Sequence, residues 1–320
     1  MFFKFINKLY RNNVYKRHGY SDSVYYFSAA DFDGLREEKY PIKSSLGHTL
    51  AGRFYSYGTA AYDRIIIFEH GMGAGHRSYM KEIELLCRRG YTVFAYDHTG
   101  CAESGGDETG GFLGSLIDLN DVLSALKSDG RFASAVFSVV GHSWGGFSAL
   151  NISAFHKDIT HIVAISGFIS IERIIEQYIG KIPFGASRRI YAEECLKNPR
   201  FATVSAERSL NGCATKALII HSRDDKTVSA EDNFDYLKQT LSDRENTYFI
   251  ELNDRDHNPN YTTRALEYKA KFFAEQKREA KRLKRATPEE KKAFVGRYDF
   301  NVMTEQDGEL WDKIFDFLES

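Results

Sequence analysis

The amino-acid sequence, 320 residues long, predicts an α/β fold built on a mostly parallel sheet with helices on both faces. Two observations carry this prediction. Short apolar runs rich in β-branched residues, which are typical of buried strands, alternate with stretches whose apolar residues recur at helical spacing. The connections between these runs are long enough for the right-handed crossovers that join parallel strands. Because no internal repeat and no low-complexity linker interrupts the pattern, we expect a single domain over residues 1–320.

The expected elements follow one another in a simple order. An antiparallel hairpin, with strands at Lys39–Ser44 and Leu50–Tyr57, supplies one edge of the sheet. The later strands are expected at Arg64–Phe68, Tyr91–Tyr96, Val136–Val140, His161–Ser166, Ala217–His221 and Thr247–Leu252. The helices between them are marked by Tyr79, Ile83 and Leu86, by Leu113, Leu116, Leu119, Leu123 and Leu126, and by Phe234, Leu237 and Leu241 behind a capping-box pattern at Ser229. Sheets of this kind carry their sites at the carboxyl ends of the strands.

Two segments are longer than a minimal fold of this kind needs. Residues 169–213 contain helix-like pieces at Ile171–Ile179 and Ala192–Leu196 and a break at Pro183–Gly185. We expect this insertion to form a small helical cap over the site and to select the substrate.

Residues 262–308 form a helical C-terminal insertion before the last amphipathic helix. A long helix is expected over Thr262–Ala286, and Thr287 and Pro288 restart a helix with a cap and a proline in place. The basic run at residues 277–286 is most simply a solvated helix face, although a binding patch is the alternative.

The composition is that of an ordinary globular protein and excludes several classes of function. Hydrophobic residues make up 42% and charged residues 27% of the chain, and the formal net charge of -1 gives no reason to expect nucleic acid as a partner. The four cysteines are scattered and form no CxxC pair. We therefore expect no metal, no disulfide framework and a cytoplasmic location. The oligomeric state stays open.

The N-terminal segment mixes apolar residues such as Phe2 and Ile6 with basic ones. Because Lys4 and Lys8 interrupt its apolar part and no small-residue cleavage site follows, it is a poor secretion signal. No stretch of the sequence approaches the ~18 apolar residues of a membrane span. A short basic amphipathic segment can lie on a membrane surface. We expect this one to pack on its own domain or to fray, without membrane contact.

The most informative stretch is VFSVVGHSWGGFSA, residues 136–149, in which an expected strand runs through a glycine-rich turn into an expected helix. In this context the Gly-x-Ser-x-Gly pattern holds Ser143 in a strained turn that exposes its hydroxyl. Gly141 and Gly145 remove side chains that would collide with the neighbouring strand and helix, and the helix N-terminus favours negative charge nearby. The alternative is that the glycines are turn residues only.

A serine nucleophile needs a base and a carboxylate that orients the base, and the sequence offers both. His257 follows the last expected strand, while the other nine histidines lack its combination of order and place. Asp224 and Asp225 follow the preceding strand, and only one of them can orient the imidazole because neighbouring side chains on an extended loop point in opposite directions.

These motifs resemble those of the α/β-hydrolase superfamily over roughly Lys39 to His257 and the last helix. Residues 141–146 resemble its nucleophile elbow, and the chain order Ser143, Asp225, His257 is that of its catalytic residues. The Asp225-x-x-Val228 pattern matches the superfamily's acid, which implies that Asp225 rather than Asp224 orients His257.

The resemblance extends to the oxyanion hole and to a branch of the superfamily. His70-Gly71-Met72-Gly73 is similar to the superfamily's HG-x-G loop, which implies that the backbone N–H groups of Met72 and Trp144 form the hole. The chain looks closest to the serine-aminopeptidase and monoacylglycerol-lipase-like branch. It departs from that branch at Ser222 and Asp256, where glycine is usual.

The resemblance implies a serine hydrolase that needs no cofactor and no metal. Related dehalogenases and epoxide hydrolases carry Asp at the position of Ser143, so their reactions are disfavoured. We expect cleavage of a carboxylic ester or thioester of a small or medium acyl substrate through an acyl-enzyme on Ser143, with His257 as general base and acid. A serine peptidase or aminopeptidase acting on small peptides is one alternative, and a non-catalytic binding module of the same fold is another. The acyl group and the leaving group stay open.

Overall fold

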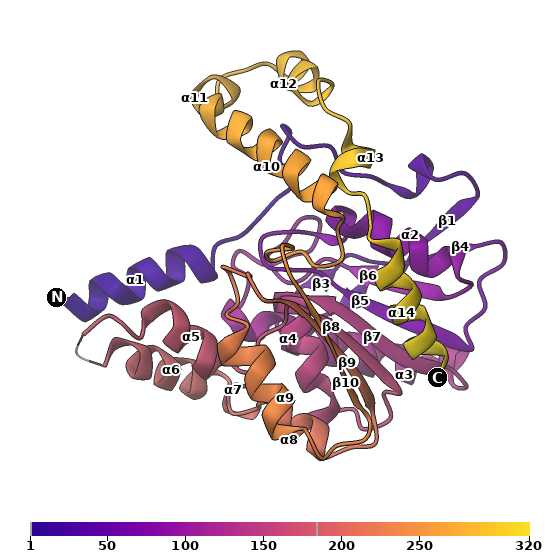
Figure 1. The fold of residues 1–320 in the computed structure, drawn as a ribbon, viewed down its shortest axis with the longest axis vertical. Coiled ribbons are helices and arrows are strands. Elements are labelled where there is room, and N and C mark those ends of the chain that lie inside the picture. The colour runs from indigo at the N-terminus through magenta and orange to yellow at the C-terminus, as the bar shows by residue number, and fades with distance from the viewer. Residues whose placement is uncertain (1, 184) are drawn as a thin grey trace.

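The fold was taken from a computed structural model that describes residues 2–183 and 185–320. Its described residues form an eight-stranded sheet in the order β1-β4-β6-β5-β7-β8-β9-β10, with β2 and β3 as a small separate pair (Figure 1). The strands are β1 Leu35–Lys39, β2 Ile42–Lys43, β3 Thr49–Leu50, β4 Gly52–Tyr57, β5 Arg64–Glu69, β6 Thr92–Tyr96, β7 Val136–His142, β8 His161–Ile165, β9 Lys216–Ser222 and β10 Thr247–Leu252. Strands β5 to β10 pair in parallel, and β1 and β4 add an antiparallel edge. The predicted α/β-hydrolase type of sheet is confirmed.

The helices of the described residues connect these strands and extend beyond them. They are α1 Phe2–Val14, α2 Met80–Arg88, α3 Gly114–Ser128, α4 Trp144–Asn151, α5 Ile171–Ile179, α6 Ala186–Lys197, α7 Pro199–Ala202, α8 Ala206–Asn211, α9 Tyr236–Thr240, α10 Thr263–Arg278, α11 Ala280–Leu283, α12 Pro288–Val295, α13 Phe300–Met303 and α14 Gly308–Glu319. None of the described helices is long and apolar enough to cross a membrane.

The sheet is covered on both faces because consecutive side chains of a strand point to opposite sides. Ile65 and Ile67 of β5 belong to one core, which also holds apolar residues of α3, α4 and α9. Ile66 and Phe68 belong to the other core, together with residues of α2 and α14. Burial on both faces explains why the central strands are continuous apolar runs rather than alternating ones.

The edge hairpin differs from the expectation. The strand that pairs with β4 is β1, which ends at Lys39, whereas the expected strand Lys39–Ser44 contains only the short β2. Pro41 lies between the two, and a proline has no N–H to donate to a strand ladder. The proline therefore separates β1 from β2, and the strand that pairs with β4 lies earlier in the sequence than expected.

The expected capping box at Ser229 is only half formed. The Ser229 hydroxyl accepts the N–H of Asp232 at 3.2 Å, but the N–H of Ser229 is bound by the Gln177 side chain of α5 at 3.0 Å. The chain then makes a π-helical turn over Glu231–Asp235 before α9 begins. A contact with a distant helix has thus replaced the local bond that the sequence pattern predicts.

Both long segments are helical. Helices α5 to α8 occupy the expected cap between β8 and β9; α5 has its expected bounds, and α6 is longer than the expected piece Ala192–Leu196. The expected break at Pro183–Gly185 includes Phe184, which lies outside the described residues.

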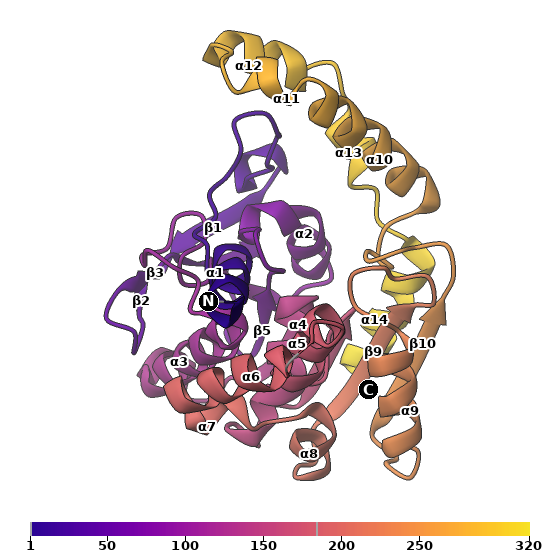
Figure 2. The ribbon, with the colours of Figure 1, turned by 90° about the vertical axis from the view of Figure 1, so that its left-hand side faces the viewer.

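At the C-terminal side, α10 ends at Arg278, so the expected helix over Thr262–Ala286 is interrupted before α11. The capping box at Thr287 forms with Glu290 at the start of α12. Helices α10 to α12 form an arm that extends away from the sheet, at the opposite end of the molecule from α7 and α8 (Figures 1 and 2).

A group of buried polar side chains lies where β5 and β6 end. Glu69, His98 and Asp118 are fully buried, and both ring nitrogens of His98 lie 3.6 Å from carboxylate oxygens of the other two. Burial lowers the pKa of His98 to about 3 and raises the pKa of Glu69 to about 8. The folded protein therefore holds a neutral imidazole and a protonated Glu69 at neutral pH.

We predict that the protonated Glu69 contributes a stability that falls as pH rises. The folded pKa of Glu69 lies above its unfolded value of about 4.3, so its contribution is complete below that value and is lost as pH rises through about 8. The Glu69→Gln variant should therefore lose less stability than the wild type between pH 5 and pH 8, by up to about 1.4 kcal/mol per pH unit. Urea unfolding at both pH values measures this difference. Glu245→Gln, at an exposed carboxylate, is the control; equal slopes for Glu69→Gln and wild type would refute the prediction.

Candidate active site

The turn between β7 and α4 holds Ser143 in an unusual backbone conformation. Its φ of 57° and ψ of -112° are rare for a residue with a side chain. Its N–H donates to the carbonyl of Ile165 in β8 at 2.8 Å, and its carbonyl accepts the N–H of Phe147 at 2.9 Å. The turn is thus tied to the neighbouring strand on one side and to its own helix on the other, which maintains the strain.

The glycines of the motif are required by close backbone contacts. A Cβ atom at Gly141 would lie 2.2 Å from the carbonyl oxygen of Gly145, and a Cβ atom at Gly145 would lie 2.2 Å from that of Glu69. A Cβ atom at Gly146 would lie 2.8 Å from Cα of Gly167, which follows β8. These contacts with a rigid backbone cannot be relieved by moving a side chain, so the glycines do more here than make a turn possible.

The structure brings Ser143, His257 and Asp225 together, each from a loop or turn that follows a strand. His257 Nε2 lies 2.8 Å from Ser143 Oγ, and His257 Nδ1 lies 2.8 Å from Asp225 Oδ2. The other oxygen of Asp225 accepts the N–H groups of Thr227 and Val228 at 2.8 and 2.9 Å. With these bonds the carboxylate is fixed in position, and the histidine is aligned between it and the serine hydroxyl.

The environment of Asp225 keeps it anionic. Burial alone would raise its pKa, but hydrogen bonds from His221 and His257 outweigh burial and hold the pKa of Asp225 below its usual value. An anionic Asp225 requires a proton on His257 Nδ1, which leaves Nε2 free to accept the hydroxyl proton of Ser143. His221 also reaches Asp225 Oδ2, at 3.2 Å. The contact between His221 and Asp225 was not predicted. Its only indication in the sequence is that His221 stands near the end of β9, four residues before Asp225.

Asp224 has a different position. Its Oδ1 accepts the Ser222 hydroxyl at 2.5 Å and the N–H groups of Arg255 and Asp256 at 3.2 and 3.3 Å. Asp256 in turn accepts the N–H of Lys226 at 3.1 Å. The two departures from the expected pattern, Ser222 and Asp256, therefore take part in one hydrogen-bonded junction between the loop of Asp225 and the loop of His257.

Tyr79 and His142 form a hydrogen-bonded bridge that the sequence did not reveal. The Tyr79 hydroxyl accepts the N–H of Gly71 at 3.1 Å and lies 2.8 Å from His142 Nδ1, while His142 Nε2 lies 2.7 Å from the carbonyl oxygen of His257. Burial lowers the pKa of His142 to about 3, so its ring is neutral. One placement of the hydrogen atoms satisfies every group. The Tyr79 hydroxyl donates to His142 Nδ1, and the N–H at His142 Nε2 donates to the carbonyl oxygen of His257. The bridge thus connects the loop after β5 to the backbone of His257.

The expected oxyanion residues lie beside the nucleophile. Met72 and Trp144 line the same cavity as Ser143 and His257. A Cβ atom at Gly71 would lie 3.5 Å from Cβ of Ser143, so the loop that carries Met72 passes next to the serine. The indole N–H of Trp144 donates to the carbonyl of Phe112 at 2.7 Å, which holds the Trp144 side chain in place.

The cavity over Ser143 has a volume of about 560 Å³ and is largely apolar. Of the cap, α5 and the residues flanking it contribute to its wall, whereas α6 to α8 do not. The N-terminal helix α1 forms another part of the wall, which the sequence did not predict. The described residues that line the cavity are Ile6, Leu9, Tyr10, Asn13, Val14, Met72, Phe112, Ser143, Trp144, Phe168, Ile174, Ile175, Tyr178, Ile179, Ile182, Thr227, Val228 and His257.

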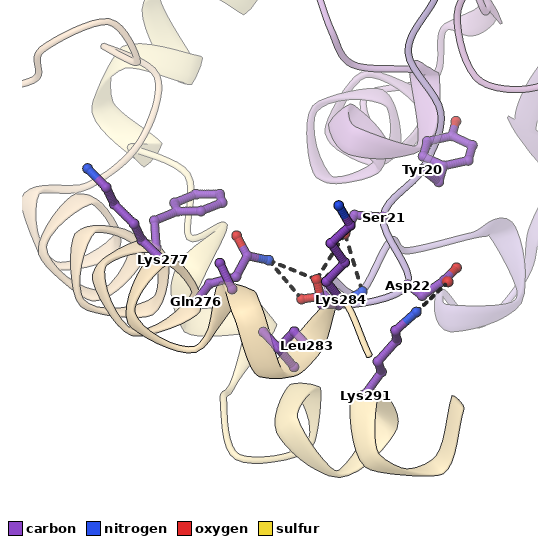
Figure 3. A pocket seen from close by; sticks show the side chains of 11 residues that line it. Tyr20, Ser21, Asp22, Gln276, Lys277, Leu283, Lys284 and Lys291 are labelled. Atoms are coloured by element: carbon purple, nitrogen blue, oxygen red, sulfur yellow. Dashed lines mark hydrogen bonds and ion pairs between the residues drawn. The ribbon is translucent and has the colours of Figure 1, made fainter. Parts of the chain in front are cut away.

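A larger cavity, of about 640 Å³, lies between residues 20–23 and the C-terminal arm. Figure 3 shows its wall, where Lys291 pairs with Asp22 at 3.2 Å and Gln276 binds Ser23. It contains none of the candidate catalytic residues. Among the residues that the structure describes, no group of three or more His, Cys, Asp and Glu side chains is arranged to hold a metal ion. The smaller cavity is therefore the candidate active site.

Known proteins resemble this chain in its fold. A family model described as the alpha/beta hydrolase fold matches residues 64–210. The uncharacterized protein YqkD of Bacillus subtilis (strain 168) is 28% identical over 127 residues, which are 39% of this chain and 40% of that protein. The match thus spans less than half the length of this relative.

Solved structures share the fold at low sequence identity. The esterase Pf2001 of Pyrococcus furiosus has a TM-score of 0.59 and 22% identity, covering 82% of this chain and 98% of the esterase. The acylaminoacyl peptidase of Pyrococcus horikoshii has a TM-score of 0.52 and 13% identity, covering 70% of this chain and 37% of the peptidase. Together with the sheet order and the matched family model, these similarities show that the chain has the α/β-hydrolase fold.

Proposed function

We propose that the protein is a serine hydrolase that cleaves a carboxylic ester or thioester of a small or medium acyl substrate. One observation carries this proposal: an unbroken hydrogen-bonded chain from Asp225 through His257 to Ser143, whose hydroxyl faces an apolar cavity. A serine is a weak nucleophile unless a base is aligned with it. The strained turn at Ser143 is the kind of backbone feature that is retained where function requires it.

The geometry supports a two-step acyl transfer. His257 Nε2 takes the proton of Ser143 as Oγ attacks the carbonyl carbon, and Asp225 stabilises the imidazolium that forms. The backbone N–H groups of Met72 and Trp144 would donate to the oxyanion. His257 then protonates the leaving alcohol or thiol, and the carbonyl of the acyl-enzyme re-forms. Water, deprotonated by the same histidine, would then attack the acyl carbon. The bond from that carbon to Ser143 Oγ breaks, His257 returns the proton to Oγ, and the acid leaves.

The cavity favours an ester over an aminopeptidase substrate. The described residues that line it include no Asp and no Glu, so a peptide's free ammonium group would be desolvated there without a charged partner. An alkoxide is also an easier leaving group than an amine. The fold alone does not distinguish an esterase from a peptidase, because a solved esterase and a solved acylaminoacyl peptidase both share it. The aligned groups argue against a binding module without catalysis.

Replacement of the proposed nucleophile is the direct test. Ser143→Ala should abolish labelling by a fluorophosphonate probe and lower ester hydrolysis on the order of 10⁴-fold or more, because no oxygen remains to form the acyl-enzyme. Ser124→Ala, at an exposed serine of α3, should label at the wild-type rate. Labelling of Ser143→Ala at that same rate would rule the proposal out.

The two neighbouring aspartates should differ sharply when each is replaced. Asp225→Asn should lower kcat by about 10³–10⁴-fold, because an amide cannot hold His257 in the required tautomer. Asp224→Asn should cost less than about tenfold, since its Oδ1 can still accept the loop N–H groups. Measuring kcat for both variants on one ester separates their roles, and the reverse ranking would assign the acid to Asp224.

A further inference from the structure

The N-terminal helix contributes to the cavity in a way that its sequence position does not suggest. Resting on the proposed function, we propose that the cavity receives an unbranched apolar acyl chain and that α1 determines the chain length accepted. The protein would then prefer esters of medium-chain fatty acids over acetate. Two sets of observations support this proposal: the lining of the cavity and the attachment of α1 to the cap.

The lining of the cavity fits a hydrocarbon chain. Apart from Ser143 and His257, its described polar residues are Asn13, Thr227 and the amphipathic Tyr10, Tyr178 and Trp144, and none of the described lining side chains is a carboxylate, ammonium or guanidinium group. A charged acyl group would lose its hydration there without an ionic partner. An apolar chain is instead stabilised by every methylene that leaves water.

Helix α1 presents one face to this cavity. Ile6, Tyr10 and Val14 are spaced four residues apart, are buried, and all line the cavity. This spacing places them on one side of the helix. Leu9 also lines the cavity although its exposed fraction is 48%, so it lies where the cavity wall meets solvent. Figure 1 shows α1 on the same side of the molecule as α5 and α6, and α1 contacts α6 directly.

Specific contacts hold α1 against α6. The Asn7 amide donates to Glu193 at 2.7 Å, and the Arg189 guanidinium lies 3.9 Å from the ring centre of Phe3. Phe3 lies near the start of α1, Asn7 lies in its middle, and Tyr15 follows its end. Because all three contact α6, the position of α1 along α6 is fixed. The wall that α1 provides is therefore built into the fold, and Ile6, Tyr10 and Val14 form its packed face.

A buried carboxylate anchors the C-terminal end of α1. The hydroxyl of Tyr15, just after the helix, donates to the buried Glu194 of α6, and Lys197 Nζ lies 3.0 Å from that hydroxyl and 3.5 Å from the same carboxylate oxygen. Burial and the nearby Glu194 raise the pKa of Tyr15, so it stays a donor. This anchor joins α1 to the insertion that covers Ser143.

Hydrolysis of p-nitrophenyl esters from acetate to octanoate, each kept below its micelle concentration, tests the proposal. In the wild type, kcat/KM should rise at least tenfold from acetate to hexanoate, since each buried methylene is worth about fourfold. Leu9→Glu places a charge on the cavity wall and should lower the hexanoate-to-acetate ratio by about tenfold or more. Phe5→Glu makes the same change on the same helix at a residue that is 64% exposed and does not line the cavity. It should keep the wild-type profile.

Each result has a definite meaning when circular dichroism shows that both variants fold. An unchanged profile in Leu9→Glu, or an equal shift in both variants, would overturn the role of α1. A wild type that prefers acetate would overturn the apolar acyl substrate. Failure of the proposed function itself has a separate signature, because a small fluorophosphonate reports on Ser143 whatever the shape of the cavity: the wild type would remain unlabelled.

Discussion

The close approach of backbone segments around the elbow is the constraint on which the site depends. The turn after β7 packs against the end of β5 through Gly145 and against the segment after β8 through Gly146 and Gly167. Side chains at these positions would push apart neighbouring strands of the central sheet. Within this turn, hydrogen bonds to Ile165 of β8 and Phe147 of α4 hold Ser143 at a positive φ, so the parallel sheet and the strained serine are maintained together. The same close backbone contacts therefore constrain both the candidate site and the packing of the core.

The remaining site residues reach Ser143 because parallel strands end at the same edge of the sheet. Asp225 follows β9 and His257 follows β10, and hydrogen bonds of Asp224, Ser222 and Asp256 join their loops. The Tyr79–His142 bridge connects the opposite side of the site, from the loop after β5 to the backbone of His257. Two independent sets of bonds thus hold the loop and the backbone of His257 in position.

The cover of the site comes from two distant parts of the chain. Helix α5 lies in the insertion after β8, and α1 begins the described chain, yet both line the cavity over Ser143. The chain at the end of α1 meets the insertion at α6 in a contact that is partly polar and buried, through Tyr15 and Glu194, which makes the contact specific in geometry. The C-terminal arm takes no part in this cavity, and its own contacts with residues 20–23 enclose a separate space. The basic run of the arm is therefore not part of the substrate site.

Local sequence determined most of the elements and the candidate site residues of this protein. Apolar runs such as Thr247–Leu252 and the glycine-rich turn at Ser143 carry signals that depend on few neighbours, and the α/β sheet follows from their alternation. Ser143, Asp225 and His257 could be singled out because each follows a strand in a known order. Only the tertiary structure decided how distant segments meet. The bonds of Gln177 to Ser229, Tyr79 to His142 and Tyr15 to Glu194 join residues that no periodicity relates, and burial rather than residue type made Glu69 protonated and His142 neutral. The place of α1 in the cavity wall was also decided by the tertiary structure. The amphipathic pattern of a helix indicates that one face will pack, but not against which surface.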